Sequence, residues 1–243
     1  MNTDTNNSGY ERAGPIACRS CDLNAICRLM GLIAYEGGRA RQSTGALRTI
    51  RTGATLYRAG APAHALFAIR QGAIKLTRST DDGDERIVSF HTPGEVLGLE
   101  AFGMEAYVCD AVALEPVHCC ELPLPRLNDR SQPTTELAAE IIQLLSRAAG
   151  LRSDFARGSA RERVTNFLLD LSRRLVSRGL DGTQLKLSMS RLEIANLLDT
   201  RIETVSRTLQ QLNREQAIHV RGHHVRLLSL GAATDGLVKE QCA

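Results

Sequence analysis

Residues 188–214 constrain the fold most strongly, because they predict two short helices joined by a tight turn. Ser190 and Glu193 have the spacing of a capping box, in which each side chain satisfies a backbone N–H at the start of a helix. The first predicted helix is Arg191–Leu198, and its apolar face is formed by Leu192, Ile194, Ala195, Leu197 and Leu198. The second helix starts at about Arg201, and its inner side is formed by Val205, Leu209 and Leu212.

The outer face of the second helix has side chains that can read DNA bases: Ile202, Glu203, Ser206 and Arg207. In the major groove, glutamate accepts a hydrogen bond from cytosine and arginine donates two to guanine. A helical hairpin with a solvated polar face is the simpler interpretation. However, residues 217–227 predict two strands around Gly222, which would complete a winged helix-turn-helix. Helix, turn and wing together favour binding to double-stranded DNA.

The composition is that of a soluble globular protein. With 243 residues, 43% of them hydrophobic, the chain can form one large domain or two ordinary ones. The net charge of +3 is small, so a nucleic-acid footprint must be a local patch. Residues 1–17 are polar and predicted to be disordered. Neither a signal peptide nor a membrane-spanning run is recognisable, so we expect a cytoplasmic protein without a membrane partner.

Residues 18–30 contain a C-x2-C-x5-C run formed by Cys18, Cys21 and Cys27. Three thiolates so close together are unfavourable unless a metal centre neutralises them. Cytoplasmic thiols stay reduced, which argues against disulfides. The irregular spacing and the lack of a second C-x2-C pair favour an iron–sulfur cluster with a distant fourth ligand. Zinc and free thiols are the alternatives.

Residues 31–132 are assigned to a β-roll sensor domain. Within them, residues from about 53 to 123 predict an antiparallel barrel or jelly roll, because short β-type segments alternate with glycine turns. The predicted strands include 66–69, 73–76, 87–90 and 111–114. One hairpin tip is acidic, and it is either a solvated turn or a contact point for a partner. The tip consists of Asp81, Asp82, Gly83, Asp84 and Glu85.

Residues 134–157 predict a long helix whose apolar residues alternate in spacings of four and three. These residues are Leu137, Ile141, Leu144, Ala148, Leu151 and Phe155. The helix can pack on the β-roll, but parallel pairing with a second copy fits the spacing better and would place two recognition helices on a palindromic DNA site. Gly150 lowers helix propensity by about 1 kcal/mol, so the pairing is expected to be marginal. A further helix, 161–178, opens a DNA-binding domain at 160–235.

The order of these parts resembles the Crp/Fnr superfamily of bacterial transcription regulators, and within it the oxygen-sensing FNR/ANR type. The strings that carry the resemblance are the cysteine run, 68–72, 90–91, 113–115, 120–123, 171–174 and 203–207. The resemblance implies an α+β fold with an N-terminal β-roll like that of cyclic-nucleotide-binding domains, a dimerisation helix and a C-terminal winged helix-turn-helix. It implies a homodimer without catalytic activity, and the histidines show no catalytic spacing.

The resemblance also implies that Cys18, Cys21, Cys27 and a fourth cysteine hold a [4Fe–4S] cluster, which oxygen degrades so that the dimer weakens. The fourth ligand in the family precedes a Glu-[Ile/Leu]-Pro string, which here makes it Cys120. Its neighbour Cys119 must point to the opposite side of a strand, and Cys119 and Cys109 are the alternatives.

Three further expectations follow from the resemblance. Glu203, Ser206 and Arg207 match the element that reads TTGAT-like half-sites, and Arg201 adds a phosphate contact beside an unusual Asp199-Thr200 turn. The acidic tip is expected to contact RNA polymerase. A cyclic nucleotide is not expected, because Leu99 follows Gly98 and residues 108–110 lack the arginine that would bind its phosphate. The alternative is a regulator of the same superfamily that senses a small ligand or nitric oxide and uses the cysteines for structural zinc.

Overall fold

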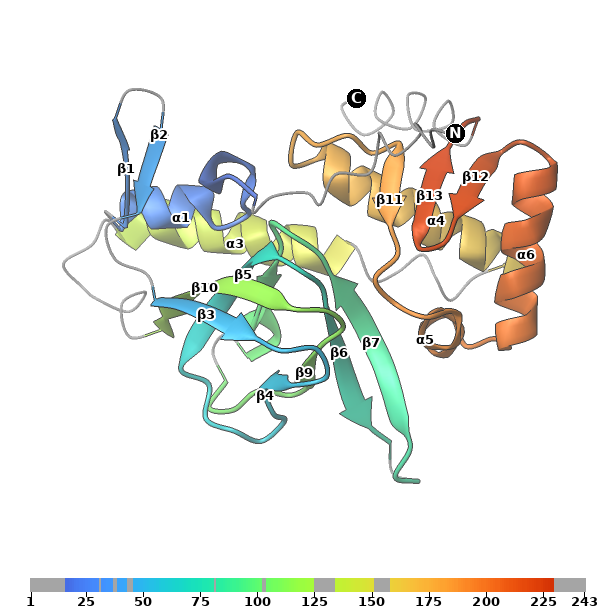
Figure 1. Ribbon diagram of the computed structural model, residues 1–243. Helices are drawn as coiled ribbons and strands as arrows, with labels where there is room; N and C mark the ends of the chain where they lie inside the picture. Colours follow the sequence, from blue (N-terminus) through green and yellow to red (C-terminus); the bar gives the residue numbers. More distant parts are fainter. Residues whose placement is uncertain are drawn as a thin grey trace, which may run out of the picture.

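The computed structural model describes residues 16–30, 32–36, 39–42, 46–80, 82–101, 104–124, 134–150 and 158–229. Figure 1 shows a β-roll, a long helix that crosses it, and a second domain of helices with a small sheet. The predicted α+β fold is therefore confirmed, with a shared hydrophobic core connecting the roll to the second domain.

The β-roll consists of two four-stranded antiparallel sheets, with strand orders β3-β10-β5-β8 and β4-β9-β6-β7. The strands are β3 (Ala46–Ile50), β4 (Thr55–Tyr57), β5 (Ala65–Gln71), β6 (Ile74–Ser79), β7 (Glu85–His91), β8 (Val96–Leu97), β9 (Asp110–Ala113) and β10 (Val117–Pro123). Alternate side chains of both sheets fill the space between them, where the rings of Tyr57 and Tyr107 stack with centroids 3.9 Å apart. Turn glycines such as Gly72 and Gly83 have φ near 90°, which residues with a side chain rarely adopt.

The cysteine-rich segment lies on the outside of the roll. It contains a 3-10 turn, η1 (Cys18–Ser20), and helix α1 (Asn24–Leu29), and the hairpin β1 (Ile33–Glu36) and β2 (Arg39–Gln42) follows. The Asn24 side chain donates to the Cys18 carbonyl at 2.8 Å and so ties the two pieces together. Leu23 and Ile26 are buried against the roll. The cysteine-rich segment is too short to form a hydrophobic core of its own, and these contacts anchor it to the sheet beneath it.

Helix α3 (Thr134–Gly150) completes the core over α1 and corrects one prediction. Ile141 and Leu144, which we assigned to a dimer seam, are buried in their own chain against Leu23 and Ile26. The apolar surface of α1 and the roll covers them. This agrees with the alternative in the sequence analysis, in which the helix packs on the β-roll. Ile142, in contrast, is exposed. Within the helix the side chains of Leu137 and Ala148 are not described, and Leu151 and Phe155 lie outside the described residues.

The second domain is a winged helix-turn-helix. It contains α4 (Ala160–Val176), β11 (Gln184–Lys186), α5 (Arg191–Leu197), α6 (Ile202–Arg214), β12 (Ile218–Arg221) and β13 (His224–Leu227), with strand order β11-β13-β12. The capping box of Ser190 and Glu193 is present at the start of α5. Asp199 adopts φ 49° in the turn, a conformation that aspartate tolerates better than most residues. One prediction is wrong: Leu192 is 62% exposed, because it lies on the solvent side of α5.

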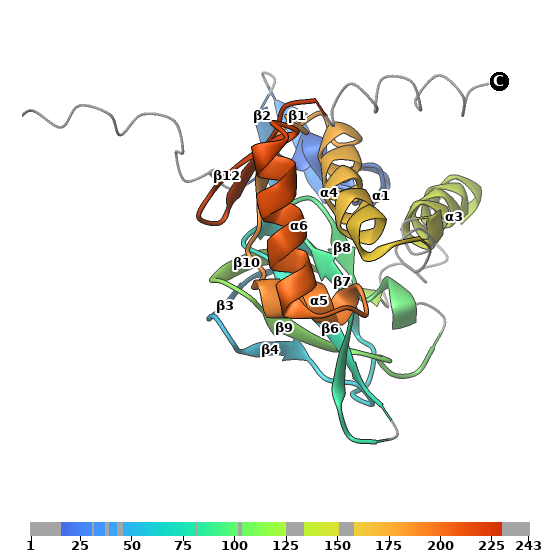
Figure 2. The same ribbon diagram turned by 90° about the vertical axis from the view of Figure 1, so that its right-hand side faces the viewer.

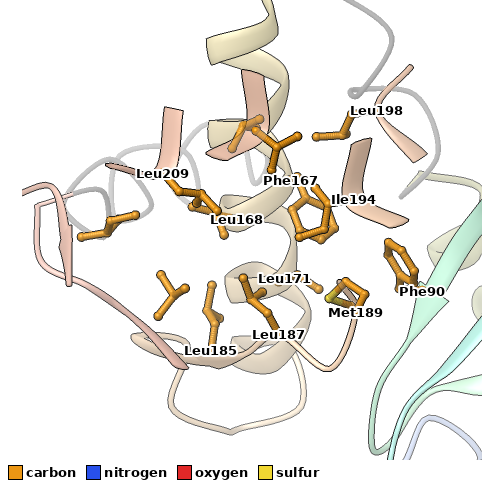
Figure 3. Close-up of a cluster of buried hydrophobic side chains, with 14 of the residues drawn as sticks. Phe90, Phe167, Leu168, Leu171, Leu185, Leu187, Met189, Ile194, Leu198 and Leu209 are labelled. Atoms are coloured by element: carbon orange, nitrogen blue, oxygen red, sulfur yellow. The ribbon is translucent and has the colours of Figure 1, made fainter. Parts of the chain in front are cut away.

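The core of this domain extends into the β-roll. Phe90 of β7 packs edge-on against Phe167 of α4, beside Met189 and Leu171 (Figure 3). Ile87 belongs to the same core. Two domains that share buried aromatic and aliphatic residues resist separation more than domains joined only by a linker.

Asn196 of α5 adds a polar contact to this interface. Its Oδ1 accepts a hydrogen bond from the Ile87 N–H at 2.7 Å, and its Nδ2 donates to the Glu85 carbonyl at 3.0 Å. Because β7 is the outer strand of its sheet, Asn196 satisfies backbone groups that no neighbouring strand pairs with.

We expect Asn196→Ala to lower the free energy of unfolding by about 1–3 kcal/mol, because it leaves the partly buried Ile87 N–H without a partner. Urea unfolding measures the change. Leu192→Ala, on the exposed side of the same helix, is the control and should lie within about 0.5 kcal/mol of the parent protein. Equal effects of the two substitutions would contradict this role for Asn196.

Candidate metal centre and nucleic-acid interface

Four cysteines, three from named elements and one from the turn before α1, gather where the cysteine-rich segment meets β10. Cys18 lies in η1, Cys21 precedes α1, Cys27 lies in α1 and Cys120 in β10. Cys21 interacts electrostatically with Cys27 and Cys120, and Cys27 interacts with Cys18 and Cys120. The fold therefore brings together the four residues that we predicted to be ligands. Their role as ligands stays a prediction.

The two alternative cysteines lie on the other side of the sheet. Cys119 and Cys120 are consecutive residues of β10, so their side chains point to opposite faces. Cys119 and Cys109 are buried in the core between the two sheets. Cys120 instead packs against the core formed with α1 and α3. The sheet thus separates Cys119 and Cys109 from the other cysteines.

Burial changes the chemistry of these thiols. It is the largest cause that raises the pKa of both Cys21 and Cys27 to about 12, and repulsion from neighbouring thiolates adds to it. Both groups are therefore protonated at neutral pH unless a metal replaces their protons. Thiolate sulfur in an apolar, partly sheltered position is the usual ligand of iron–sulfur clusters, and the four residues fit that group chemically. Within the described ranges, there is no group of three or more His, Cys, Asp or Glu side chains that could hold a single metal ion.

A buried ionic cluster beside the thiols connects the cysteine-rich segment to the DNA-binding domain. The backbone N–H of Asp22 donates to the Gly94 carbonyl at 2.8 Å. The next residue, Glu95, accepts from Arg174 at 2.9 Å and from Arg178 at 3.1 Å, and both arginines belong to the C-terminal end of the α4 region. Arg178 also lies 3.9 Å from the Asp22 carboxylate. Three parts of the chain thus meet at Glu95.

Glu95 stays ionised although it is fully buried. Burial opposes its charge, but the attraction of Arg174 and Arg178 outweighs this and lowers the pKa below the usual value. Sequence analysis missed this residue, because a lone glutamate in a turn has no pattern that identifies an ion pair 79 residues away. The only available signal was the Leu-Ser-Arg-Arg string at 171–174, which already formed part of the family resemblance.

The outward face of α6 is free to meet a DNA groove in this chain. Glu203 and Arg207 are exposed and Ser206 is half-buried, whereas Val205 and Leu209 form the inner side as predicted. Figure 2 shows α6 along the front of the domain with the wing strand β12 beside it. Arg201 occupies the N-cap position of α6, where its side chain caps no backbone group, and it is exposed together with Ile202. These positions suit contacts to bases and phosphates.

The acidic tip lies at the end of the β6–β7 hairpin. Asp82, Gly83 and Asp84 are exposed, and Asp81 lies outside the described residues. Glu85 is exposed but forms an ion pair with Lys75 at 2.9 Å. Among the described residues of the tip, Asp82 and Asp84 are therefore the stronger candidates for contact with a partner.

A β-roll that shares its core with a winged helix-turn-helix defines a DNA-binding transcription regulator. Comparisons with known proteins agree: a family model of the cyclic nucleotide-binding domain matches residues 47–132, and one of the Crp-like helix-turn-helix domain matches residues 162–232. The chain belongs to the Crp/Fnr family of transcription regulators and is of the FNR/ANR type. Regulators of this family are not enzymes, in agreement with the sequence analysis.

Individual relatives cover most of the chain. It is 35% identical to the transcriptional activator protein anr of Pseudomonas aeruginosa over 89% of this chain and 91% of that protein. It is 31% identical to the fumarate and nitrate reduction regulatory protein of Escherichia coli over 87% and 86% of the two chains. The solved structure of FixK2 from Bradyrhizobium japonicum is similar with a TM-score of 0.67 and 26% identity, covering 79% of this chain and 97% of that one. No helix in the described ranges is long and apolar enough to span a membrane.

Proposed function

We propose that this protein is a cytoplasmic, oxygen-responsive transcription regulator of anaerobic gene expression, with a [4Fe–4S] cluster bound by Cys18, Cys21, Cys27 and Cys120. The observation that supports this most is the position of these thiols: Cys21, Cys27 and Cys120 pack against the core formed with α1 and α3, and Cys18 interacts electrostatically with Cys27. When bound, the cluster supplies a group that oxygen oxidises and disassembles. The similarity to anr and to the fumarate and nitrate reduction regulatory protein supports the same proposal.

Two sets of contacts support a coupling between this site and DNA binding. Leu23 and Ile26 of the cysteine-rich segment pack against Ile141 and Leu144 of α3, so a change in the segment alters the support of that helix. Asp22 joins the Glu95 cluster and so reaches α4 at the start of the DNA-binding domain. Loss of the cluster would loosen both contacts, because the short segment has little core of its own.

The regulator would act as a homodimer on palindromic sites with TTGAT-like halves. Pairing uses the helix of 134–157, with Leu137, Ala148, Leu151 and Phe155 as the candidates and the exposed Ile142 as an apolar addition. Each copy presents Ile202, Glu203, Ser206 and Arg207 to one half-site, and Arg201 to a phosphate. The hairpin tip, Asp81 to Glu85, would contact RNA polymerase.

A cyclic nucleotide is not part of this proposal. The Tyr57 hydroxyl donates to the Glu100 carboxylate at 2.7 Å and accepts from the Gly98 N–H at 3.1 Å. The Gly98 N–H and the Glu100 carboxylate, which follow β8, therefore already have a protein partner. Cys109 is buried in the core, in the segment where the phosphate-binding arginine was missing. An unpaired phosphate placed there would be strongly unfavourable.

The decisive experiment is anaerobic purification followed by an absorption spectrum with iron and sulfide analysis, before and after exposure to air. We expect a broad band near 400 nm that bleaches in air, with about four irons per chain. Binding to a TTGAT palindrome should fall when the band is lost. Zinc without iron or sulfide would contradict the cluster and favour a regulator with a structural zinc site.

Glu203→Ala should cost about 1–3 kcal/mol of DNA-binding free energy and relax the preference at one base pair, because the carboxylate reads a base edge. Binding assays on half-sites with each base at that position measure this. Arg201→Ala is the matched comparison: it should weaken binding to all sequences and lower the salt dependence by about one phosphate contact. If Glu203→Ala also weakened all sequences equally, its role in base reading would be wrong.

A further inference from the structure

Arg70 is a positive charge beside the thiols that the sequence analysis did not assign. It lies near the end of β5, the strand that pairs with β10, where Ala68 is the partner of Cys120. Its Nη1 donates to Cys18 Sγ at 3.4 Å and to Cys120 Sγ at 3.8 Å. One guanidinium therefore reaches two of the four proposed ligands, one from η1 and one from β10.

The position of this guanidinium is fixed by further contacts. Arg70 Nε donates to the Ile16 carbonyl at 2.8 Å, and the Ile16 N–H donates to the Arg70 carbonyl at 2.8 Å. The chain entering the cysteine-rich segment is thus paired with the end of β5. A planar guanidinium with several donors can serve a carbonyl and two sulfur atoms at once, which the single ammonium of lysine matches less well.

Electrostatics support a functional contact. An arginine side chain keeps its proton at any physiological pH, so the Arg70 guanidinium is cationic beside the Cys18 and Cys120 sulfur atoms. Hydrogen bonds with an ionised partner are about twice as strong as neutral ones, so the contact strengthens when the sulfurs become thiolates.

We propose that Arg70 is a positioning residue for the metal centre: its guanidinium holds Cys18 and Cys120 at their ligand positions and offsets the negative charge of the bound cluster. The inference rests on the proposed iron–sulfur function. Groups just outside the ligands set both metal affinity and redox potential in other centres. A purely structural role, in which Arg70 only ties Ile16 to the roll, is the competing explanation.

The test compares R70Q, R70K and the control R78Q in the full-length protein, loaded anaerobically with iron and sulfide. R78Q removes the same charge from an exposed position near the tip of the β6–β7 hairpin, which points away from α1 in Figure 1. Three quantities are measured: iron and sulfide per chain, the rate at which an iron chelator removes the iron, and the midpoint potential of the one-electron couple of the cluster.

We expect R70Q to lose iron to the chelator about 10-fold faster than the parent protein, the lower end of the effects of such outer contacts. Its midpoint potential should shift to a more negative value, because removing a nearby positive charge favours the oxidised form. R70K, which keeps the charge, should retain the parent potential and show an intermediate rate. R78Q should match the parent protein in all three quantities.

The outcomes separate this inference from the proposed function. A parent protein that takes up no iron–sulfur cluster would overturn both. A loaded parent protein with R70Q equal to R78Q in release rate and potential would overturn the role of Arg70 alone. Faster release by R70Q and R70K alike, without a shift in potential, would assign Arg70 the structural role. If R70Q stays folded by circular dichroism but takes up no cluster, uptake by R70K supports the proposal, and failure of both overturns it.

Discussion

Glu95→Ala is expected to lower the free energy of unfolding by about 3–5 kcal/mol, the usual effect of removing one partner from a buried ion pair. The substitution leaves the buried guanidinium groups of Arg174 and Arg178 without the carboxylate that they share. Because these arginines belong to the DNA-binding domain and Glu95 to the β-roll, the interface between the domains should weaken as well. Urea unfolding followed by circular dichroism measures the change.

Glu115→Ala is the matched control for this substitution. Glu115 also bridges the two domains, through Lys186 and Ser188, but its interaction with Lys186 is largely exposed. An exposed ion pair contributes about 0–1 kcal/mol, so the control should change stability far less. If both variants lost the same free energy of unfolding, the buried ionic cluster would stabilise the protein no more than an exposed ion pair does.

The pH dependence of Glu95 follows from its lowered pKa. A carboxyl group whose pKa is lower in the folded state stabilises the protein above its usual value of 4.5, and this stabilisation is lost as the pH falls toward the lowered value. The difference in stability between the parent protein and Glu95→Gln should therefore shrink as the pH falls below 4.5. A difference that persisted unchanged to lower pH would contradict the ionised state of Glu95.

Cys120→Ala is expected to abolish cluster binding, whereas Cys119→Ala should retain it. The two residues are neighbours in β10, but Cys120 reaches the thiols of the cysteine-rich segment and Cys119 lies in the core of the roll. In anaerobic preparations, iron should fall from about four per chain to near zero only in Cys120→Ala, because a thiolate is the ligand.

Cys119→Ala also controls for the loss of a thiol from the same strand. It creates a small cavity in the roll and should cost stability without changing the spectrum. Retention of the cluster by Cys120→Ala together with its loss from Cys119→Ala would make Cys119 the fourth ligand and our assignment wrong.

The elements of the DNA-binding domain followed from the sequence because their signals are local. The capping box of Ser190 and Glu193, the inner side of α6 and the glycine of the wing each involve residues a few positions apart. The same reasoning assigned the strands of the roll from alternation and turns. Leu192 shows the limit, since a leucine at the edge of an apolar stripe can face solvent on a helix of only seven residues.

The candidate metal centre was predictable in part. The C-x2-C-x5-C run identified three cysteines by spacing, and Cys120 came from the family resemblance alone. Only the pairing of β10 with β5 and the fold of η1 bring Cys120, Cys18 and Arg70 together. Spacing in the sequence limits which residues can converge locally, but it does not specify contacts made across 50 positions.

By itself, the sequence determined the elements of the DNA-binding domain, several strands of the roll and the chemistry of the exposed side of α6, but not α1 or the β1–β2 hairpin. The tertiary structure alone decided what covers the apolar faces of the helices. The apolar stripe of α3 illustrates this, since its spacing favoured a second copy, whereas Ile141 and Leu144 meet α1 of their own chain. The Glu95 cluster is similar, because its charges come from the cysteine-rich segment, the roll and the α4 region. Periodicity arises from local backbone geometry, whereas the choice of partner depends on the summed free energy of burial over the whole chain.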